Sequence, residues 1–395
     1  MFLHILGRQP ALGVAELEAL YGAEAVHSFG NAAIVSVDRQ DFLRLGGTVK
    51  AGQIIAEYSG KQDILRELSD VIVQEIRKLP EDGKIKLGVS LYGFPIRPQK
   101  INAFMLETKK TIKKTGRSVR IVPNQEAELS SAQVLHNKLT DEMGIELVAF
   151  YANNKIVIAR TVYVQNIDSY AFRDRSRPMR DARVGMLPPK LAQIIINLAA
   201  GKPNVTAETT VLDPFCGTGV LLQEALLMGF SAYGSDLSER MIEYSEKNLE
   251  WLKTTREYAS TRRASTNQTI QLETGDASNH IWKPLPYCIA AETFLGKPLN
   301  EIPAPHILQS IIKECDDLHR AFLKNIATQW PADARFCLAV PAWRHKNGFY
   351  HLPVIDDLAS LGYNRIDFTR VRNDDLVYHR DGQVVARELL VITKR

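Results

Sequence analysis

Three aspartates and a glycine-containing turn have the spacing that a nucleoside-binding site requires. Asp213 ends an apolar run and is followed at once by the turn at 214–219, which reads PFCGTG. Asp236 ends the next apolar run, and Asp276 follows a third. Parallel strands present their carboxyl ends at one edge of a sheet, and α/β proteins bind nucleotides at that edge. The spacing therefore predicts a ligand site formed by three strand ends.

Each of these residues has a chemical use in such a site. Gly217 and Gly219 let the backbone approach a ligand where a Cβ would collide. The carboxylate of Asp236 can accept both hydroxyls of a ribose, Asp276 can accept from an adenine amino group, and Asp213 can face a cation through ordered water. The predicted cofactor-binding residues are Asp213, Pro214, Phe215, Gly217, Gly219, Asp236, Leu237, Asp276 and Ala277.

The turn lacks the signatures of two other nucleotide sites. A phosphate-binding loop needs GxxxxGK[ST], and a dinucleotide site needs the third glycine of GxGxxG. This turn has neither pattern. Its combination with acidic strand ends predicts a site for S-adenosylmethionine (SAM), and the alternative is a purely structural turn.

The elements that position this site alternate between strand and helix. Seven strand-like runs with helical segments between them predict an α/β, Rossmann-like doubly wound sheet in the C-terminal half. The expected strands are at 209–213, 231–236, 270–275, 287–292, 334–340, 364–369 and 388–394. Helices and strands also alternate up to about residue 165, which predicts α+β structure there.

Composition excludes several classes of protein. The chain has 395 residues, 45% of them hydrophobic, and a formal net charge of +4, so it is neither disordered nor histone-like. Its four cysteines are far apart, which excludes a disulfide framework and a cysteine-rich zinc site. We expect no bound metal, a cytoplasmic protein with reduced thiols and, since no apolar run reaches about 18 residues, no membrane span.

Two segments concentrate positive charge. Six basic residues and no acidic one lie at 109–120, which is either a solvated helix face or a surface that contacts phosphates. Residues 166–188 lack helical or strand periodicity and are rich in arginine. We interpret them as an inter-domain linker, which is either neutralised by its own aspartates or a track for a polyanion.

Several segments resemble one family. DPFCGTG at 213–219, the preceding RDARVGMLPPKLAQIIINLA, the C-terminal LVYHRDGQVVARELLVI, and the N-terminal ILGRQPALGVAELEALYG and LGGTVK carry the resemblance. They are similar to the THUMP-containing tRNA guanosine N2-methyltransferases, including the archaeal type that modifies the guanosine at position ten. The resemblance covers most of the chain.

The resemblance implies an organisation and a set of partners. It implies a ferredoxin-like domain at 1–60, a THUMP-like RNA-binding domain at 61–165, the linker at 166–188 and a Rossmann-like methyltransferase domain at 189–395. SAM is then the cofactor and tRNA the partner of a monomer, with an accessory protein left open. The candidate RNA contacts are Lys109, Lys110, Lys113, Lys114, Arg117, Arg173, Arg175, Arg177 and Arg180.

The segment after the fourth expected strand departs from the family. The family carries Asp-Pro-Pro-Tyr-Gly there, or Asn for Asp, whereas 291–296 reads AETFLG. A guanine amine is a poor nucleophile because its lone pair is delocalised, so the motif must accept from the amine and stack on the base. Glu292 can replace the acid and Phe294 the ring, while Thr293 does not fix φ as proline does. We take Glu292, Thr293 and Phe294 as the candidate catalytic residues.

Three functions are compatible with the sequence. The first is SAM-dependent methylation of a tRNA guanosine at N2 by an altered acceptor motif. The second is methylation of another atom or base. The third is a SAM-binding, tRNA-binding protein that has lost catalysis. A small-molecule methyltransferase would leave the N-terminal half without a use.

Overall fold

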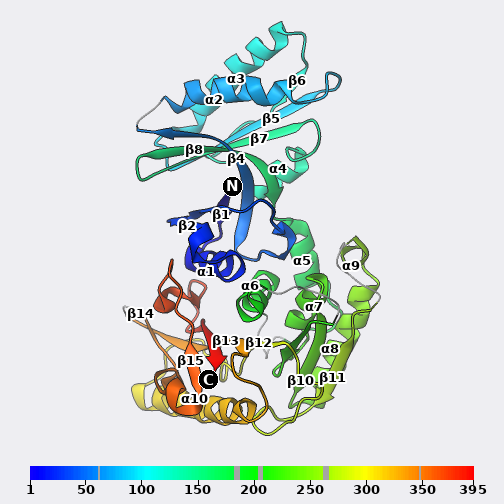
Figure 1. Ribbon diagram of the computed structural model, residues 1–395, viewed down its shortest axis with the longest axis vertical. Coiled ribbons are helices and arrows are strands. Elements are labelled where there is room, and N and C mark those ends of the chain that lie inside the picture. The colour runs from blue at the N-terminus through cyan, green and yellow to red at the C-terminus, as the bar shows by residue number, and fades with distance from the viewer. Residues whose placement is uncertain (61–62, 182–186, 203–207, 261–266, 347) are drawn as a thin grey trace. The chain divides into compact units, whose positions relative to one another are not determined.

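The computed structural model describes residues 1–60, 63–181, 187–202, 208–260, 267–346 and 348–395 (Figure 1). It divides into two compact units. Unit 1 is Met1–Pro10, Glu24–Phe42 and Thr48–Asp168, and unit 2 is Ala11–Ala23, Leu43–Gly47 and Ser169–Arg395. Helix α1 (Pro10–Tyr21) therefore belongs almost entirely with the C-terminal part of the chain.

Unit 1 is built on one eight-stranded sheet in the order β2-β3-β1-β4-β8-β7-β5-β6. The strands are β1 (Phe2–Leu6), β2 (Val26–Phe29), β3 (Ala32–Val35), β4 (Thr48–Ser59), β5 (Ile85–Tyr92), β6 (Val119–Ile121), β7 (Gly144–Ala152) and β8 (Lys155–Val164). Helices α2 (Ile64–Arg77) and α3 (Pro98–Lys114) lie side by side in Figure 1 and share a core with β5, β7 and β8. A short helix, α4 (Ser131–His136), follows β6.

The sheet of unit 1 joins two ranges that the sequence analysis treats separately. Strand β4 pairs antiparallel with β8, so strands from 1–60 and from 61–165 share one ladder. The fully buried ion pair of Lys50 with Glu146 also joins these two ranges. The division into a ferredoxin-like and a THUMP-like domain stays a prediction.

Unit 2 contains a nine-stranded sheet whose main path is β11-β10-β9-β12-β13-β17-β15. The path strands are β9 (Thr210–Asp213), β10 (Ser231–Asp236), β11 (Ile270–Thr274), β12 (Cys288–Glu292), β13 (Arg335–His345), β15 (Tyr363–Arg365) and β17 (Val385–Lys394). They confirm the seven expected strands. The sequence analysis missed β14 (Gly348–Tyr350) and β16 (Val377–Tyr378), which pair with β13 and β17.

Helices cover both faces of this sheet. Helices α6 (Pro189–Ala200), α7 (Val220–Leu227) and α8 (Glu239–Lys253) pack on one face. Helix α10 (Pro305–Ala327) and the 3-10 helix η3 (Pro353–Leu361) pack on the other. The short elements α9 (Arg256–Ser260), η1 (Ala23–Ala25), η2 (Phe42–Arg44) and η4 (Asn373–Asp375) complete the chain. In the described residues, no helix has the length and hydropathy needed to cross a membrane.

Helix α1 packs into the core of unit 2. Leu12 and Ala15 join the buried cluster around α6. Glu16 is fully buried, accepts from the backbone N–H groups of Gly46 and Gly47 at 2.9 and 2.8 Å, and accepts from Asn197 Nδ2 at 2.7 Å. Burial raises the pKa of Glu16 to about 7, although these hydrogen bonds oppose the shift. One carboxylate thus fastens both N-terminal segments of unit 2 to α6.

The expected aperiodic linker is helical in its first part, which corrects the sequence analysis. Helix α5 (Ile167–Arg175) has a buried side that holds Tyr170 and Arg173, and Arg177 is buried just beyond it. These residues follow helical spacing, but they are polar, so a search for apolar periodicity misses them. Residues 182–186 of the same segment lie outside the described part of the chain.

Candidate functional site

A cavity of about 780 Å³ opens where the sheet of unit 2 reverses its strand order. Strand β9 pairs in parallel with β10 on one side and with β12 on the other, and ligands of open α/β sheets bind at such a reversal. The wall includes three strand-end carboxylates, those of Asp213, Asp236 and Glu292. The other predicted cofactor residues in the wall are Pro214, Phe215, Gly217, Leu237, Asp276 and Ala277.

Asp236 holds the glycine turn in place. Its Oδ2 accepts from the backbone N–H of Gly217 at 3.0 Å, and its Oδ1 accepts from that of Ser238 at 2.9 Å. Gly217 has a φ of 52°, a conformation that favours glycine. The carboxylate at the end of β10 therefore fixes the turn that follows β9, in addition to facing the cavity.

Gly219 lies between two residues of the cavity wall, Thr218 and Val220. It precedes α7 with a φ of 79°. A Cβ at this position would lie 2.9 Å from the Oγ of Ser245, and the same Oγ donates to the carbonyl of Gly217 at 2.8 Å. Gly219 therefore allows close packing of the turn against α8, and its approach to a ligand stays a prediction.

The cavity carries an excess of buried negative charge. Burial raises the pKa of Asp213 well above its ordinary value; the N–H of Phe215 opposes this, and the carboxylates of Asp236 and Glu292 raise it further. Burial also raises the pKa of Asp236, against the effect of its two backbone donors. Like charges that share a desolvated site repel each other. A cationic ligand such as a sulfonium would relieve that repulsion.

The outer part of the cavity suits an adenosine group. Asp276 is exposed, and its Oδ1 accepts from the backbone N–H of Ser278 at 2.9 Å. Leu237 lies in the wall with 73% of its surface exposed, so an aromatic ring could cover it. Ala277 is buried beside them.

The acceptor side of the cavity depends on an arginine from β17, which is distant in sequence. Arg387 forms an ion pair through its Nε with Glu292 Oε1. Neighbours on a strand point to opposite faces, and the adjacent Glu388 pairs with Arg365 at 2.8 Å. Glu292 Oε2 makes no hydrogen bond with a described residue, so this oxygen is the one available to an amine.

Thr293 anchors the segment after β12. It is 4% exposed, its backbone N–H donates to Ala339 O at 3.1 Å, and its Oγ1 lies 2.7 Å from His319 Nε2. Burial lowers the pKa of His319 to about 4, so the ring is neutral near pH 7. Since His319 Nδ1 must donate to the carbonyl of Cys315 at 2.6 Å, Nε2 is an acceptor. His319 Nε2 and Ala339 O, 2.7 and 3.0 Å from Oγ1, are thus the two acceptors for the one proton of the Thr293 hydroxyl. Thr293 thus lines the cavity and anchors the segment that carries Glu292 and Phe294.

Phe294 lies in the cavity wall and also packs against the core beneath α10. Its ring can therefore stack on a base only with the face that the core leaves uncovered. The sequence analysis also missed Arg240, Lys297 and Glu314, which line the cavity without any local motif.

Two predicted RNA contacts are buried, which corrects the sequence-based expectation for them. Arg173 is 6% exposed, and its guanidinium donates to both oxygens of Glu224, at 2.7 and 3.2 Å. Arg177 is 3% exposed and donates to Thr218 Oγ1, within the glycine turn, at 3.3 Å. Both arginines hold α5 and the following residues against unit 2, Arg173 at α7 and Arg177 at the glycine turn. Arg175 and Arg180 are exposed.

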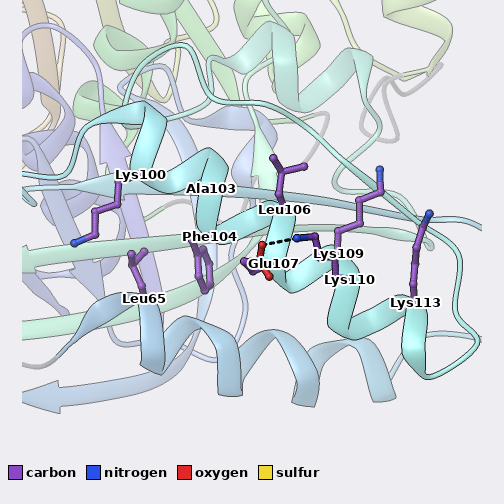
Figure 2. A pocket seen from close by; sticks show the side chains of 9 residues that line it. All are labelled: Leu65, Lys100, Ala103, Phe104, Leu106, Glu107, Lys109, Lys110 and Lys113. Atoms are coloured by element: carbon purple, nitrogen blue, oxygen red, sulfur yellow. Dashed lines mark hydrogen bonds and ion pairs between the residues drawn. The ribbon is translucent and has the colours of Figure 1, made fainter.

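Unit 1 has a separate basic groove on α3 (Figure 2). This α3 groove has a volume of about 660 Å³ and is lined by Leu65, Lys100, Ala103, Phe104, Leu106, Glu107, Lys109, Lys110 and Lys113. Glu107 pairs with Lys110 at 2.7 Å. Lys114 is exposed beyond the groove, and half-buried Arg117 donates to Pro80 O at 2.5 Å. Cations beside an aromatic ring suit a nucleic acid strand.

Comparison with known proteins agrees with this arrangement. Residues 177–293 match UPF0020, an RMKL-like methyltransferase domain. The chain is 36% identical over 99 residues to the tRNA (guanine(10)-N2)-dimethyltransferase of Methanothermobacter thermautotrophicus, which covers 25% of this chain and 28% of that protein. It is 34% identical over 106 residues to the enzyme of that name from Pyrococcus abyssi, which covers 27% and 30%. The matches therefore span less than a third of these relatives.

One solved structure shares the whole fold. The crystal structure of TrmN from Thermus thermophilus covers 100% of this chain, and 99% of that chain is covered in turn, with a TM-score of 0.51 and 17% identity. At this identity the likeness supports the fold alone.

The residues of the cavity fit SAM. The clustered carboxylates complement a sulfonium, Asp236 has acceptors for a ribose, and Asp276 and Leu237 suit an adenine. In the described residues, no group of three or more His, Cys, Asp or Glu side chains could hold a metal.

Proposed function

We propose that this chain, which carries an RMKL-like methyltransferase domain at 177–293, transfers a methyl group from SAM to the exocyclic N2 amine of a tRNA guanosine. One observation carries the proposal: the strand-end aspartates and the Glu292–Phe294 segment face the same cavity of about 780 Å³. A donor site and an acceptor site within one cavity are what direct transfer between two substrates requires.

Glu292 is the residue that we assign to the amine. When bound, SAM supplies an electrophilic methyl group on a sulfonium. Glu292 Oε2 accepts an N–H of the amine, which orients the nitrogen lone pair toward that methyl group and receives the proton that the nitrogen must lose. Arg387 holds Oε1 and so fixes the direction of Oε2. General-base assistance of this kind contributes about 10²–10⁴-fold in rate.

Two further residues complete the acceptor side. Phe294 stacks on the target base once that base has left its own stack. Thr293 and His319 replace the rigidity of the family's prolines with a buried hydrogen bond of 2.7 Å. Small misplacements of reacting groups are costly, so this anchor supports the altered motif.

The tRNA contacts are assigned to exposed cations. In unit 1 these are Lys110, Lys113 and Lys114, with the half-buried Lys109 and Arg117 beside them, and the α3 groove adds Lys100. In unit 2 they are Arg175 and Arg180. Because phosphate contacts release counterions, binding of tRNA should weaken steeply as salt is raised. A flat salt dependence would contradict the assignment.

A second candidate function has two observations in its favour. The guanidinium of Arg387 already occupies one oxygen of Glu292, and both prolines of the family motif are absent. A chain that binds SAM and tRNA without turnover would have the same features.

Turnover separates the two functions. Purified protein is incubated with methyl-labelled SAM and an unmodified tRNA transcript, and the digested nucleosides are identified by mass spectrometry. Labelled N2-methylguanosine, or its dimethyl form, supports the proposal. A different labelled nucleoside keeps the fold and cofactor but moves the acceptor. No label, with SAM and tRNA both bound, favours the protein without turnover.

A further inference from the structure

The margin of unit 2 beside the acceptor side of the cavity carries partly exposed aromatic rings interleaved with cations. It is formed by the β13–β14 hairpin and by residues 378–380 next to β17. Its members are Arg344, His345, Phe349, Tyr350, Tyr378, His379 and Arg380, and we call it the aromatic margin. The sequence analysis assigned no site here.

Contacts order these side chains. The rings of His345 and Tyr350 lie 4.6 Å apart, and those of Phe349 and His379 lie 5.4 Å apart. The Arg344 guanidinium lies 5.4 Å from the centre of the Phe349 ring, and its Nη2 is 3.3 Å from His379 Nδ1. The rings are therefore held in place before any ligand arrives, so little freedom is lost on binding.

The margin nevertheless keeps ring surface and charge available to solvent. Tyr350 is 51% exposed, and Arg380 and Lys346 are exposed. Residues 344–350 and 378–380 include Arg344, Lys346 and Arg380 and no carboxylate, with Asp375 and Asp381 close by in sequence. Aromatic rings that only stabilise the fold do not need cations beside them. A strand of nucleic acid binds to both, because its bases stack on rings and its phosphates pair with cations.

The aromatic margin is joined to the acceptor side of the cavity by strand pairing. Tyr378 is the cross-strand partner of Arg387, and Arg387 contacts Glu292 in the cavity wall. Directly paired residues of antiparallel strands have Cα atoms about 5 Å apart. Arg380 in turn donates to the Tyr378 hydroxyl at 3.2 Å. The margin thus begins on the strand that pairs with Arg387, the residue that orients Glu292.

We propose that the aromatic margin binds the single-stranded nucleotides next to the target base, stacking them on Tyr350 and Phe349 while Arg380 contacts their phosphates. A base that enters the cavity leaves its neighbours without a stacking partner, and these rings replace it. The inference rests on the proposed function, because it takes RNA as the substrate.

Cross-linking tests the surface independently of turnover. The full chain is irradiated with a tRNA transcript that carries 4-thiouridine, and cross-linked residues are mapped by mass spectrometry. We expect cross-links on Phe349, Tyr350 or His379. Cross-links confined to unit 1, or no binding of the tRNA, would overturn the proposal.

Matched variants test the energetics. Tyr350→Leu and Arg380→Gln are each expected to raise the KM for tRNA about tenfold, with kcat and the Kd for SAM unchanged, whereas Tyr350→Phe keeps the wild-type KM. The controls are Tyr287→Leu, since Tyr287 is 52% exposed, and Arg256→Gln on α9. Equal KM values for Tyr350→Leu and Tyr287→Leu would refute the stacking role.

The two proposals fail in different ways. Wild-type protein that methylates no tRNA but cross-links at the aromatic margin contradicts the proposed function only. If the wild-type protein methylates tRNA but shows no cross-links at the aromatic margin, and the margin variants keep the wild-type KM, only the proposal for the margin is contradicted. The margin would then be tested for binding of a protein partner.

Discussion

The donor half and the acceptor half of the cavity are built in different ways. In the donor half, Asp213 and Asp236 bond to backbone groups that lie 2 or 19 positions away in sequence. In the acceptor half, Glu292 is held by a residue 95 positions away, and Thr293 by residues 26 and 46 positions away. The donor half is therefore a local motif, whereas the acceptor half is an assembly of distant side chains.

This difference separates cofactor binding from chemistry. The turn at 214–219 is held by Asp236, Ser245 and Arg177, none of which belongs to the acceptor half, so it keeps its geometry when the residues of the acceptor half change. The acceptor half can vary, as AETFLG differs from the motif of the family that the sequence resembles, without loss of the cofactor site. Mutations in the two halves should then affect different measurable quantities.

The largest effect is expected from Glu292→Gln. The amide keeps the shape but loses the negative charge and the proton acceptor, so kcat for tRNA methylation should fall about 100-fold or more. The Kd for SAM, measured by titration calorimetry, should stay within about twofold. Glu314→Gln is the control, because Glu314 also lines the cavity but is not assigned to the amine. A Glu292→Gln variant that keeps full kcat would remove Glu292 from the mechanism.

Asp236→Ala should weaken SAM binding more than it lowers kcat, which is the reverse of the result expected for Glu292→Gln. It removes the acceptor of two backbone N–H groups and of the ribose hydroxyls, which should weaken SAM binding by about 2 kcal/mol, or about 30-fold in Kd. Activity at saturating SAM should recover most of the loss. Glu239→Ala, at an exposed acid three positions on, serves as the control. If Asp236→Ala lowers kcat but leaves SAM binding intact, the division between the halves is wrong.

Thr293→Val should have a smaller effect, confined to the acceptor half. Valine keeps the volume but removes the hydroxyl beside His319 Nε2 and Ala339 O, which should cost about 1–2 kcal/mol in the free energy of unfolding. We expect kcat to fall about tenfold as the segment loosens. Thr293→Ser should restore both values, and thermal unfolding followed by circular dichroism measures the first. Equal kcat for the valine and serine variants would show that the anchor is dispensable.

The smallest effect concerns pH and the donor half. Raised pKa values mean that Asp213 and Asp236 take up protons at higher pH than ordinary aspartates. A sulfonium prefers their ionised forms, so the Kd for SAM should rise several-fold as pH falls from about 8 to about 5.

The free energy of unfolding of the ligand-free protein should depend on pH in the opposite sense. A carboxyl whose folded-state pKa is raised contributes stability at low pH, and this contribution is lost as pH rises through that pKa. Asp213→Asn should flatten both profiles, and a Kd that is constant with pH in the wild type would contradict the charge argument.

The sequence predicted the donor half better than the acceptor half for the same physical reason. The strand ends and the turn lie in one continuous segment, so their spacing fixed Asp213, Gly217 and Asp236 as neighbours. The packing of Gly219 against Ser245 was not predictable, because Ser245 belongs to another helix. No local pattern marks Arg387 as the partner of Glu292.

Burial explains the remaining differences between sequence and structure. All seven expected strands of unit 2 are present because each is an apolar run flanked by turn residues. Arg173 and Arg177 were assigned to RNA because the sequence does not distinguish exposed arginines from arginines that are buried and paired. Their partners, Glu224 and Thr218, become neighbours only in the folded protein.

The place of α1 in unit 2 has a consequence for how the chain is made. The bonded pair Glu16 and Asn197 is separated by 181 residues. At about 5–20 residues per second, the ribosome delivers Asn197 about ten to forty seconds after Glu16. During that interval Leu12 and Leu17, both destined for burial, have no partner from α6. Unit 1 can complete its sheet in the same time, whereas α1 cannot pack until α6 has been synthesised. Helix α1 is therefore a segment of the nascent chain that exposes apolar surface to which a chaperone would bind.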